Sequence, residues 1–304
     1  MRFRGRIGAD QLQLISDVVQ AMYRQGEFLC LKLTPTHLHA IVNCSNSAGS
    51  NGVIPTFAKF NAAEILFFEY LVESNANNEI CLECDPLQFL RASRSVKESP
   101  EVLLTLKKRQ NIPRIVLEAT MINGVKVTQD VPVRVLNEDE FQNAGEPVVD
   151  PPKVRIMLPK DVVSIRSVAD KLRIFGKYVS IIADLNGCLE LNSHSDAVNI
   201  RSIYTNLQAK GVIEANQNTS QTGQVQLDSS TAMNRASVVV DSRQLSQALK
   251  CTSVRHDRVL FCLTPGEVCI VYLAIFNSVG TLVFYLPAID GGICLKGEAP
   301  LIEL

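Results

Sequence analysis

The feature that most constrains the fold is an internal duplication. When the chain is shifted by 150 residues against itself, apolar residues fall on apolar residues and glycine falls on glycine. The matched pairs are Ile15 with Ile165, Val18 with Val168, Met22 with Leu172, Gly26 with Gly176, Phe28 with Tyr178 and Leu31 with Ile181. A shift of 156 residues aligns Asp85 with Asp241 and Phe89 with Leu245. A series of matches in one order predicts two copies of a unit of about 140 residues, an ordinary domain size.

Residues 138–152 separate the two copies. Four acidic side chains before Pro147, one glycine and three prolines leave this stretch too few aliphatic residues to cover a core, so it is predicted to be an extended connector. The expected domains are 1–137 and 153–290. Residues 215–234, rich in Gln, Asn, Ser and Thr, are predicted to be a disordered surface insertion, and 291–304 form a tail.

Composition narrows the class of protein. The chain is 46% hydrophobic, enough for two domains with cores, but it has no apolar run near the ~20 residues that span a bilayer and no signal-peptide pattern. Nine scattered cysteines favour reduced thiols. We therefore expect a soluble, intracellular protein. With 30 basic and 31 acidic residues, any attraction to nucleic acid must come from local basic surface.

The hydrophobic pattern predicts strand, helix and strands, twice over. Apolar and basic residues alternate over 1–7, which predicts a strand with one face in solvent. Asp10 is a plausible N-cap, and apolar residues at helical spacing then continue until Gly26. Further helices are expected at 86–97, 160–175 and 242–254. The remaining apolar segments predict antiparallel strands, which makes the fold class α+β with two helices in each pseudo-symmetric domain.

Three of the four predicted helices carry basic residues away from their apolar stripes. The pairs that share a helix face are Arg91 with Arg94, Arg166 with Arg173, and Arg243 with Lys250. Such rows can neutralise DNA phosphates in any sequence, because duplex DNA carries one charge per about 1.7 Å of its axis. The alternative is that these are ordinary solvated faces. The first helix, with Asp10 and Asp17 against Arg24 alone, argues against DNA contact there.

The residues that could support catalysis or metal binding do not form a site in the sequence. Cys81 and Cys84 have metal-ligand spacing but no second pair, and residues three apart on a strand face opposite sides. His37 and His39 lack a third ligand. There is no phosphate-binding glycine loop or nucleophile elbow. We expect a non-catalytic chain without metal or cofactor.

The duplicated unit with its mid-chain connector resembles the PCNA-like sliding clamps. Several short segments resemble, more closely, the Hus subunits of the heterotrimeric DNA-damage checkpoint clamp. These segments are Met1-Arg-Phe-Arg-Gly-Arg-Ile, Asn78-Glu-Ile-Cys-Leu-Glu, Val131-Pro-Val-Arg-Val, Glu146-Pro-Val-Val, Ile156-Met-Leu-Pro159 and Tyr285-Leu-Pro-Ala288. They occur in the family's order over nearly the whole chain.

The resemblance implies a clamp ring in which helices line a hole around double-stranded DNA, bound independently of sequence. The lining helices would be 11–24, 86–97, 160–175 and 242–254. The side chains expected to face DNA are Arg91, Arg94, Lys97, Arg166, Lys171, Arg173, Arg243 and Lys250.

The resemblance also implies assembly surfaces. The edge strands that close the ring would be 114–121 and 198–204, with apolar contact from Ile115, Leu117, Ile200 and Ile203. Phe141 and Val148 would mark the neighbourhood of a partner-docking groove beneath the connector.

The partners implied by the family are two sister subunits of the Rad type, an ATP-driven clamp loader, and repair and signalling proteins, with no membrane. The location implied is the nucleus, with the cytoplasm as a second location. Three alternatives stay open: a homotrimeric replication clamp, a scaffold of the same fold without DNA contact, and an enzyme that uses the cysteine or histidine residues.

Overall fold

The structure is a computed structural model. It describes residues 1–42, 54–137, 140, 145–159, 162–194, 198–211 and 234–289. The chain forms two compact units. Unit 1 consists of Met1–Glu146, Lys250–Asp257 and Leu273–Phe284, and unit 2 of Pro147–Leu249, Arg258–Tyr272 and Tyr285–Leu304. The predicted domain limits, 1–137 and 153–290, stay a prediction. The predicted insertion, apart from Asn234, and the tail at 291–304 lie outside the described residues.

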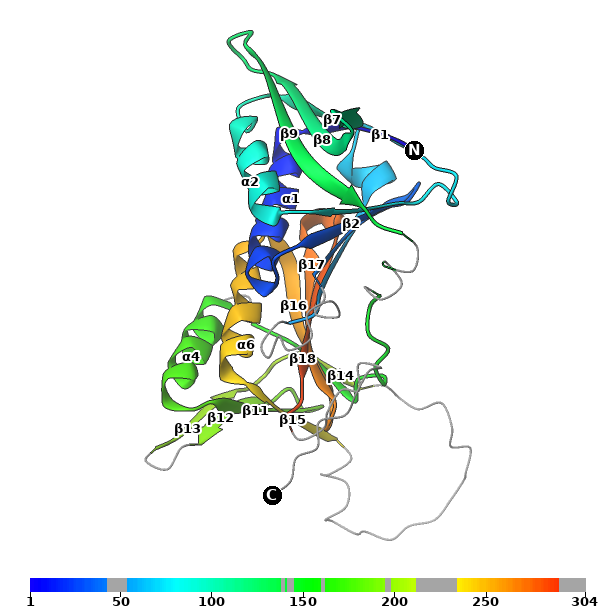
Figure 1. Cartoon of the computed structure of the whole chain (residues 1–304). Helices are drawn as coiled ribbons and strands as arrows, with labels where there is room; N and C mark the ends of the chain where they lie inside the picture. Colours follow the sequence, from blue (N-terminus) through cyan, green and yellow to red (C-terminus); the bar gives the residue numbers. More distant parts are fainter. Residues whose placement is uncertain are drawn as a thin grey trace. The chain divides into compact units, whose positions relative to one another are not determined.

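Within the described residues, the same order of strands and α-helices occurs twice: strand, helix, five strands, helix and three strands (Figure 1). The first series is β1 (Arg2–Gly8), α1 (Ala9–Met22), β2 (Leu29–Leu33), β3 (His37–Val42), β4 (Thr56–Asn61), β5 (Glu69–Glu73), β6 (Ile80–Cys84), α2 (Pro86–Ser95), β7 (Glu101–Arg109), β8 (Ile112–Thr120) and β9 (Lys126–Val135). The second series is β10 (Val154–Met157), α4 (Val162–Phe175), β11 (Tyr178–Asp184), β12 (Leu189–His194), β13 (Asn199–Tyr204), β14 (Ala209–Gly211), β15 (Arg235–Asp241), α6 (Ser242–Ala248), β16 (His256–Thr264), β17 (Val268–Ile275) and β18 (Gly280–Pro287). Short helical turns follow α1 (η1, Tyr23–Gln25), β4 (η2, Ala62–Leu66), α6 (η3, Leu249–Ser253) and β17 (η4, Phe276–Ser278).

Unit 1 is built from antiparallel strands. One run of neighbours is β4-β3-β2-β6, and a second is β9-β8-β7-β1-β5. Residues 133–135 of β9 also pair with β6, which joins the two runs. The start of β18 comes from the second half of the sequence and pairs with β4, with Gly280 opposite Phe60 and Phe284 opposite Thr56.

Unit 2 repeats these runs. Strands β13-β12-β11-β15 correspond in order to β4-β3-β2-β6, and β14-β10-β16 correspond to β5-β1-β7. All of these pairings are antiparallel, so most hydrogen bonds of the unit join strands that run in opposite directions. The repeated strand order supports the internal duplication that the sequence predicted.

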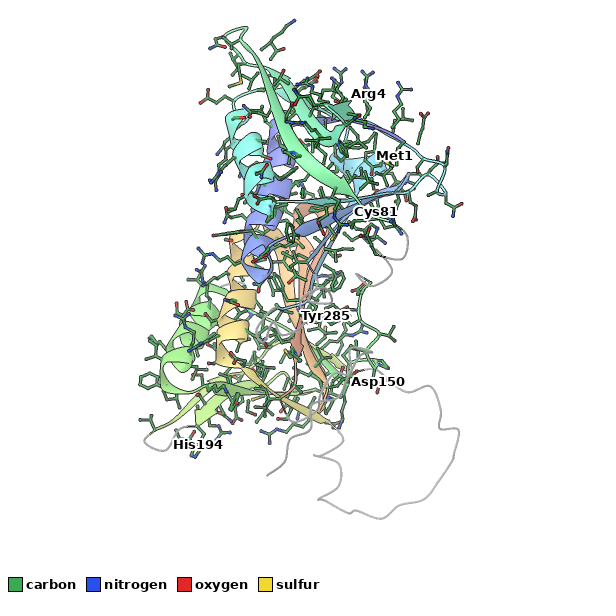
Figure 2. The ribbon with its side chains drawn as sticks, viewed as in Figure 1. Met1, Arg4, Cys81, Asp150, His194 and Tyr285 are labelled. Carbon is green, nitrogen blue, oxygen red and sulfur yellow. The ribbon has the colours of Figure 1, made fainter. Side chains whose placement is uncertain are left out.

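The helices cover one face of the strands within each unit and bury their apolar stripes there. Helix α1 lies beside α2 and contacts β1 and β7, and α2 contacts β9 (Figure 1). Helix α4 lies beside α6, with α4 against β12 and α6 against β15. The other side of β1 carries arginines, among them Arg4, which projects away from α1 and α2 (Figure 2). This alternation follows from the period of two along a strand.

Several local predictions need correction. Gly8, and not Asp10, is the N-cap of α1, and Asp10 lies in its first turn. The apolar segment 65–71 is not one continuous strand, because a π-helical turn occupies Ala62–Leu66 and β5 begins only at Glu69. The last predicted helix stops being α-helical at Ala248, so Lys250 lies on the 3-10 turn η3.

Candidate functional site

The basic side chains of α2 lie on its exposed face. Asp85 is the N-cap of the helix, because its carboxylate accepts a hydrogen bond from the Leu87 N–H at 2.8 Å and proline occupies the first position. The buried side of the helix consists of Pro86, Phe89, Leu90, Ala92 and Ser93. Arg91 and Arg94 are therefore exposed, and the exposed Lys97 follows the end of the helix.

Arg94 also connects the two helices of unit 1. Its Nη2 donates a hydrogen bond to Gln20 Oε1 of α1 at 2.9 Å. A guanidinium bonded to an amide keeps its full charge, so the contact orients Arg94 without neutralising it. Helix α1 itself offers no basic residue in its last turn, and its Asp17 accepts a hydrogen bond from Gln13 at 2.7 Å. Of the two α-helices α1 and α2, only α2 carries basic residues.

The helices of unit 2 carry a second group of cations. Val162, Ile165, Ala169 and Leu172 form the buried stripe of α4. On the remaining surface of α4, Arg166 is half-buried while Lys171 and Arg173 are exposed.

Helix α6 is fixed at its start and along its side. Asp241 begins α6 by accepting hydrogen bonds from the N–H groups of Arg243 and Gln244, and the Arg243 side chain is exposed. Ser246 Oγ donates to Asp170 Oδ1 at 2.5 Å and ties α6 to α4. Lys250, on η3, is half-buried and belongs to unit 1.

The helix cations differ from the strand cations in whether they form ion pairs. Many strand cations form ion pairs with carboxylates: Arg2, Arg4, Arg6, Lys32, Lys107, Arg109, Arg114, Arg134, Arg201 and Arg235. Within the described ranges, none of the eight predicted DNA-facing residues forms an ion pair. The helix faces therefore keep positive charge that a polyanion can neutralise, while much of the strand charge is already compensated.

The expected first edge strand is wrong. β8 pairs with β7 along one side and with β9 along the other, so it is an interior strand. Ile115 and Leu117 are 2% and 0% exposed and belong to the core. The open strand is β9, because residues 126–132 pair with β8 and only 133–135 pair on the other side, with β6. At the turn before β9, Ile122 and Val125 are 88% and 53% exposed.

The second expected segment does lie at the edge of its sheet, and its role in ring closure stays a prediction. In the described part of unit 2, β13 pairs only with β12. Ile203 is 50% exposed and Ile200 is half-buried, and the two side chains lie on opposite faces of the strand. Apolar side chains that the sequence analysis did not single out are also exposed at the end of α4, where Ile174 and Phe175 are 76% and 46% exposed.

A buried carboxylate stabilises the edge strand β13. Glu190 on β12 is 5% exposed, and its oxygens bond the Arg201 guanidinium at 2.6 Å and the Arg235 guanidinium at 3.3 Å. The hydrogen bond from Arg201 holds the pKa of Glu190 below its ordinary value. Because two arginines share one buried carboxylate, this cluster keeps part of its positive charge while Glu190 holds both guanidinium groups in place.

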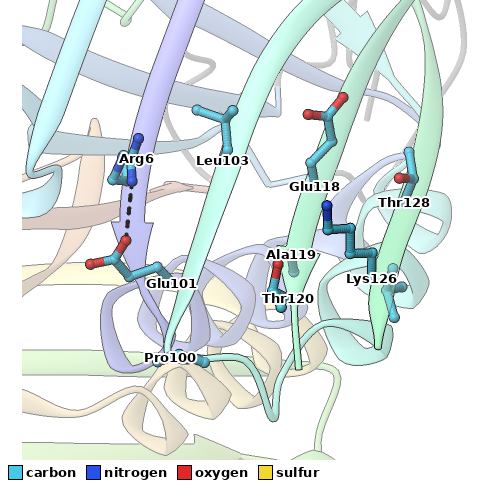
Figure 3. Close-up of a pocket in the computed structure, with 10 residues that line it drawn as sticks. Arg6, Pro100, Glu101, Leu103, Glu118, Ala119, Thr120, Lys126 and Thr128 are labelled. Atoms are coloured by element: carbon cyan, nitrogen blue, oxygen red, sulfur yellow. Dashed lines mark hydrogen bonds and ion pairs between the residues drawn. The ribbon is translucent and has the colours of Figure 1, made fainter. Parts of the chain in front are cut away.

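Two hollows lie on the strands of unit 1. Figure 3 shows the first, of about 510 Å³, on β1, β7, β8 and β9. Arg6 and Glu101, which line it, pair at 3.4 Å, and Glu118 pairs with Lys107. The second hollow, of about 680 Å³, is lined by β2, β3, β4 and β18 and by connector residues Gly145 and Glu146.

The two predicted docking markers have different outcomes. Val148 is 99% exposed and does not line the second hollow, and Phe141 lies outside the described residues. The connector residues that do line the hollow are Gly145 and Glu146. Strand side chains therefore form most of this hollow. The position of the connector in the sequence could not identify those side chains.

The cysteine and histidine pairs do not assemble a metal site in the described part of the chain. Cys81 is half-buried, Cys84 is buried, and no cluster of three or more potential ligands occurs there. The His37 and His39 rings are 6.0 Å apart. Burial, followed by the charge of Lys59, lowers the pKa of His39 to about 4, so this imidazole is neutral at pH 7. No helix in the described ranges has the length and apolarity to cross a membrane.

Comparison with known proteins places these features in a family. A family model described as Hus1-like protein matches residues 1–290. The checkpoint protein hus1 of Schizosaccharomyces pombe is 28% identical over 287 residues, covering 90% of this chain and 93% of that protein. The checkpoint protein HUS1 of Homo sapiens is 24% identical over 300 residues, covering 95% and 100%.

Solved structures resemble the fold. The proliferating cellular nuclear antigen of Entamoeba histolytica matches with a TM-score of 0.69 at 12% identity, covering 94% of this chain and 98% of that one. The corresponding antigen of Thermococcus kodakaraensis matches with a TM-score of 0.66, covering 94% and 99%. The predicted PCNA-like clamp fold is thereby confirmed.

Proposed function

The chain belongs to the Hus1-like family, non-enzymatic subunits of the PCNA-like checkpoint clamp, and we propose that it forms one third of a heterotrimeric ring around duplex DNA. In this proposal the ring is held at damaged DNA or stalled forks and recruits signalling and repair proteins. The domains 1–137 and 153–290, joined by the connector 138–152, are its two repeats. The nucleus is its main location.

The contrast between paired strand cations and unpaired helix cations carries the DNA-binding part of the proposal. Residues such as Arg91, Arg94 and Arg173 have no carboxylate partner in the described ranges, and they project from helices whose other side is buried. Phosphates can supply the missing counter-charge without any reading of bases. A ring that slides along DNA needs contacts to phosphates, because it must bind every DNA sequence equally well.

The internal pairing of β18 with β4 supports a route to ring closure. β18 ends the second repeat as β9 ends the first, and β13 occupies the place in the second repeat that β4 has in the first. β4 is covered by β18, whereas β13 and most of β9 have one open side. We assign the open side of β9 to one sister subunit and that of β13 to the other, since unpaired strand edges are templates for pairing. Ile200 and Ile203 keep their proposed contact role, together with Ile174 and Phe175.

Loading and recruitment need other proteins. The sequence has no nucleotide-binding glycine loop of its own, so an ATP-driven loader is the partner proposed to open the ring. Docking of repair and signalling proteins is proposed at the 680 Å³ hollow beside Gly145 and Glu146. This hollow replaces Val148 as the centre of the proposed docking region.

Charge reversal tests the DNA contact. The variant carries Arg91→Glu, Arg94→Glu, Arg166→Glu and Lys250→Glu, and it is assembled with the two sister subunits and loaded on circular DNA. Retention after dilution into about 150 mM salt should fall at least about tenfold while assembly is unchanged, because four phosphate contacts are replaced by repulsion.

The matched control carries the same charge change on exposed strand cations that lack an ion pair in the described ranges. These are Lys108, Arg155, Lys210 and Arg258, each replaced by Glu. Its retention should stay near that of the unaltered ring. Equal retention of the two variants would instead favour a scaffold of the same fold that does not touch DNA.

A further inference from the structure

The strands beneath the connector align two rows of side chains on one face. Pairing of β2 with β3, β3 with β4, and β4 with β18 sets the register. One row consists of Cys30, Ile41, Phe57 and Val283, and the other of Lys32, His39, Lys59 and Thr281. The members of the two rows are two residues apart on each strand, so they share a face and lie about 7 Å apart.

The two rows give the 680 Å³ hollow an apolar floor and a basic wall. Ile41, Phe57 and Val283 line it and are 6 to 8% exposed, so they form its deep part. Lys59 is exposed at its wall, and the nearby Lys32 and His39 are half-buried. The hollow therefore offers apolar surface in its deep part and the charge of Lys59 at its wall, which Glu79 and Glu146 also line.

Lys59 is the cation of this wall that can accept a partner. Lys32 Nζ already pairs with Glu79 Oε2 at 2.7 Å. Lys59 forms no ion pair within the described ranges, although Glu79 and Glu146 also line the hollow. Its charge acts on its surroundings: it is among the causes that lower the pKa of both His37 and His39. A carboxylate placed beside Lys59 would gain a charge pair and lie near the Thr281 hydroxyl, which can donate a hydrogen bond.

We propose that this hollow selects partner peptides in which an acidic side chain lies close to an apolar one, the acid at Lys59 and the apolar group above Phe57. The proposal rests on the proposed role of the chain in recruiting proteins and names the chemistry of the recruited segment. An apolar segment alone would leave Lys59 without a counter-charge, and a basic segment would be repelled by it. The acid thus provides specificity, while the apolar group provides contact area.

A peptide selection tests this inference. A displayed library of random 12-residue peptides is selected on the purified full chain, and the enriched peptides are then measured by fluorescence anisotropy. We expect enriched sequences that carry Asp or Glu within three residues of an apolar side chain. Replacing the acid by its amide should weaken binding about 2- to 5-fold, the size of one exposed charge pair.

Variants at Lys59 locate the effect. Lys59→Gln should remove the discrimination between acid and amide peptides, and Lys59→Arg should keep it. Lys108→Gln, at an exposed lysine on β7 outside the hollow, should leave it unchanged. The inference is overturned by any of three results: no enriched peptides that depend on Lys59, enriched peptides without an acid, or discrimination that survives Lys59→Gln.

The same variant separates this inference from the proposed function. A ring assembled with Lys59→Gln should still be retained on DNA, because Lys59 lies on a strand and not on a cationic helix. If the unaltered chain fails to assemble or to hold DNA, the ring proposal fails, while the peptide selection still reports on the hollow. If assembly and retention are intact but selection fails, only the inference about the hollow is wrong.

Discussion

At the scale of single residues, the presence or absence of a carboxylate partner separates two kinds of basic side chain. Arg134 on β9 pairs with Glu83 at 3.0 Å and with Glu140 at 2.5 Å, whereas Arg91 on α2 has no such partner in the described ranges. Exposed pairs of this kind add only about 0 to 1 kcal/mol to stability. Their larger effect is on the field around the protein, because they neutralise strands and leave helix charge uncompensated.

His39 gives a residue-scale prediction on pH dependence. In the unfolded chain His39 binds a proton near its ordinary pKa of 6.5, but in the folded protein it does so only near pH 4. Unfolding therefore takes up a proton between these values, so the free energy of unfolding falls as the pH drops from 6.5 toward 4. His39→Gln should make this dependence shallower, as measured by urea unfolding at pH 7.0 and 5.0. Identical pH dependence in the variant and the unaltered protein would contradict the prediction.

At the scale of elements, the alternation of apolar and polar residues and the residues typical of helix starts predicted the helices and strands, because these depend on local chemistry. The helices expected from 86 and from 242 do begin at Pro86 and Ser242, and the repeated series of strands and helices is present. These features depend on side chains close in sequence, which is why a single sequence reveals them. The same holds for the cations of α2, whose exposure follows from the buried stripe of that helix.

Edge strands were harder to predict because strand order is set by distant pairing. The apolar segment 114–121 was assigned to an edge, yet Val116 and Leu117 are fully buried between two neighbours. Proline does not distinguish the two strands, because β9 contains Pro132 and the interior strand β8 contains Pro113. The exposed Ile174 and Phe175 also lack a signal, since they extend an otherwise ordinary helix.

The two open edges give an element-scale prediction. Ile203→Asp on β13 should weaken binding to one sister subunit by at least about tenfold and leave the other pair intact, because each edge meets a different neighbour. The double variant Ile122→Asp with Val125→Asp, beside β9, should have the converse effect. Both changes are at exposed positions, so the chain should stay folded. Pairwise binding of each purified sister subunit measures this, and loss of both contacts in either variant would contradict it.

At the scale of the whole molecule, the duplication of sequence becomes a duplication of strand order. The runs β4-β3-β2-β6 and β13-β12-β11-β15 are equivalent, and so are β5-β1-β7 and β14-β10-β16. A repeat that covers β4 with β18 but leaves β13 open cannot satisfy its own edges within one chain. Pairing with neighbouring chains would cover these edges, and in the proposed ring the neighbours are the two unlike sister subunits.

The mass of the chain in native conditions tests this claim most directly. Alone, the purified chain should be a monomer of 33.5 kDa. With both sister subunits added it should form a complex that contains one copy of each, and with either one alone a pair. A stable trimer of this chain by itself, near 100 kDa, would contradict the account and favour a homotrimeric clamp.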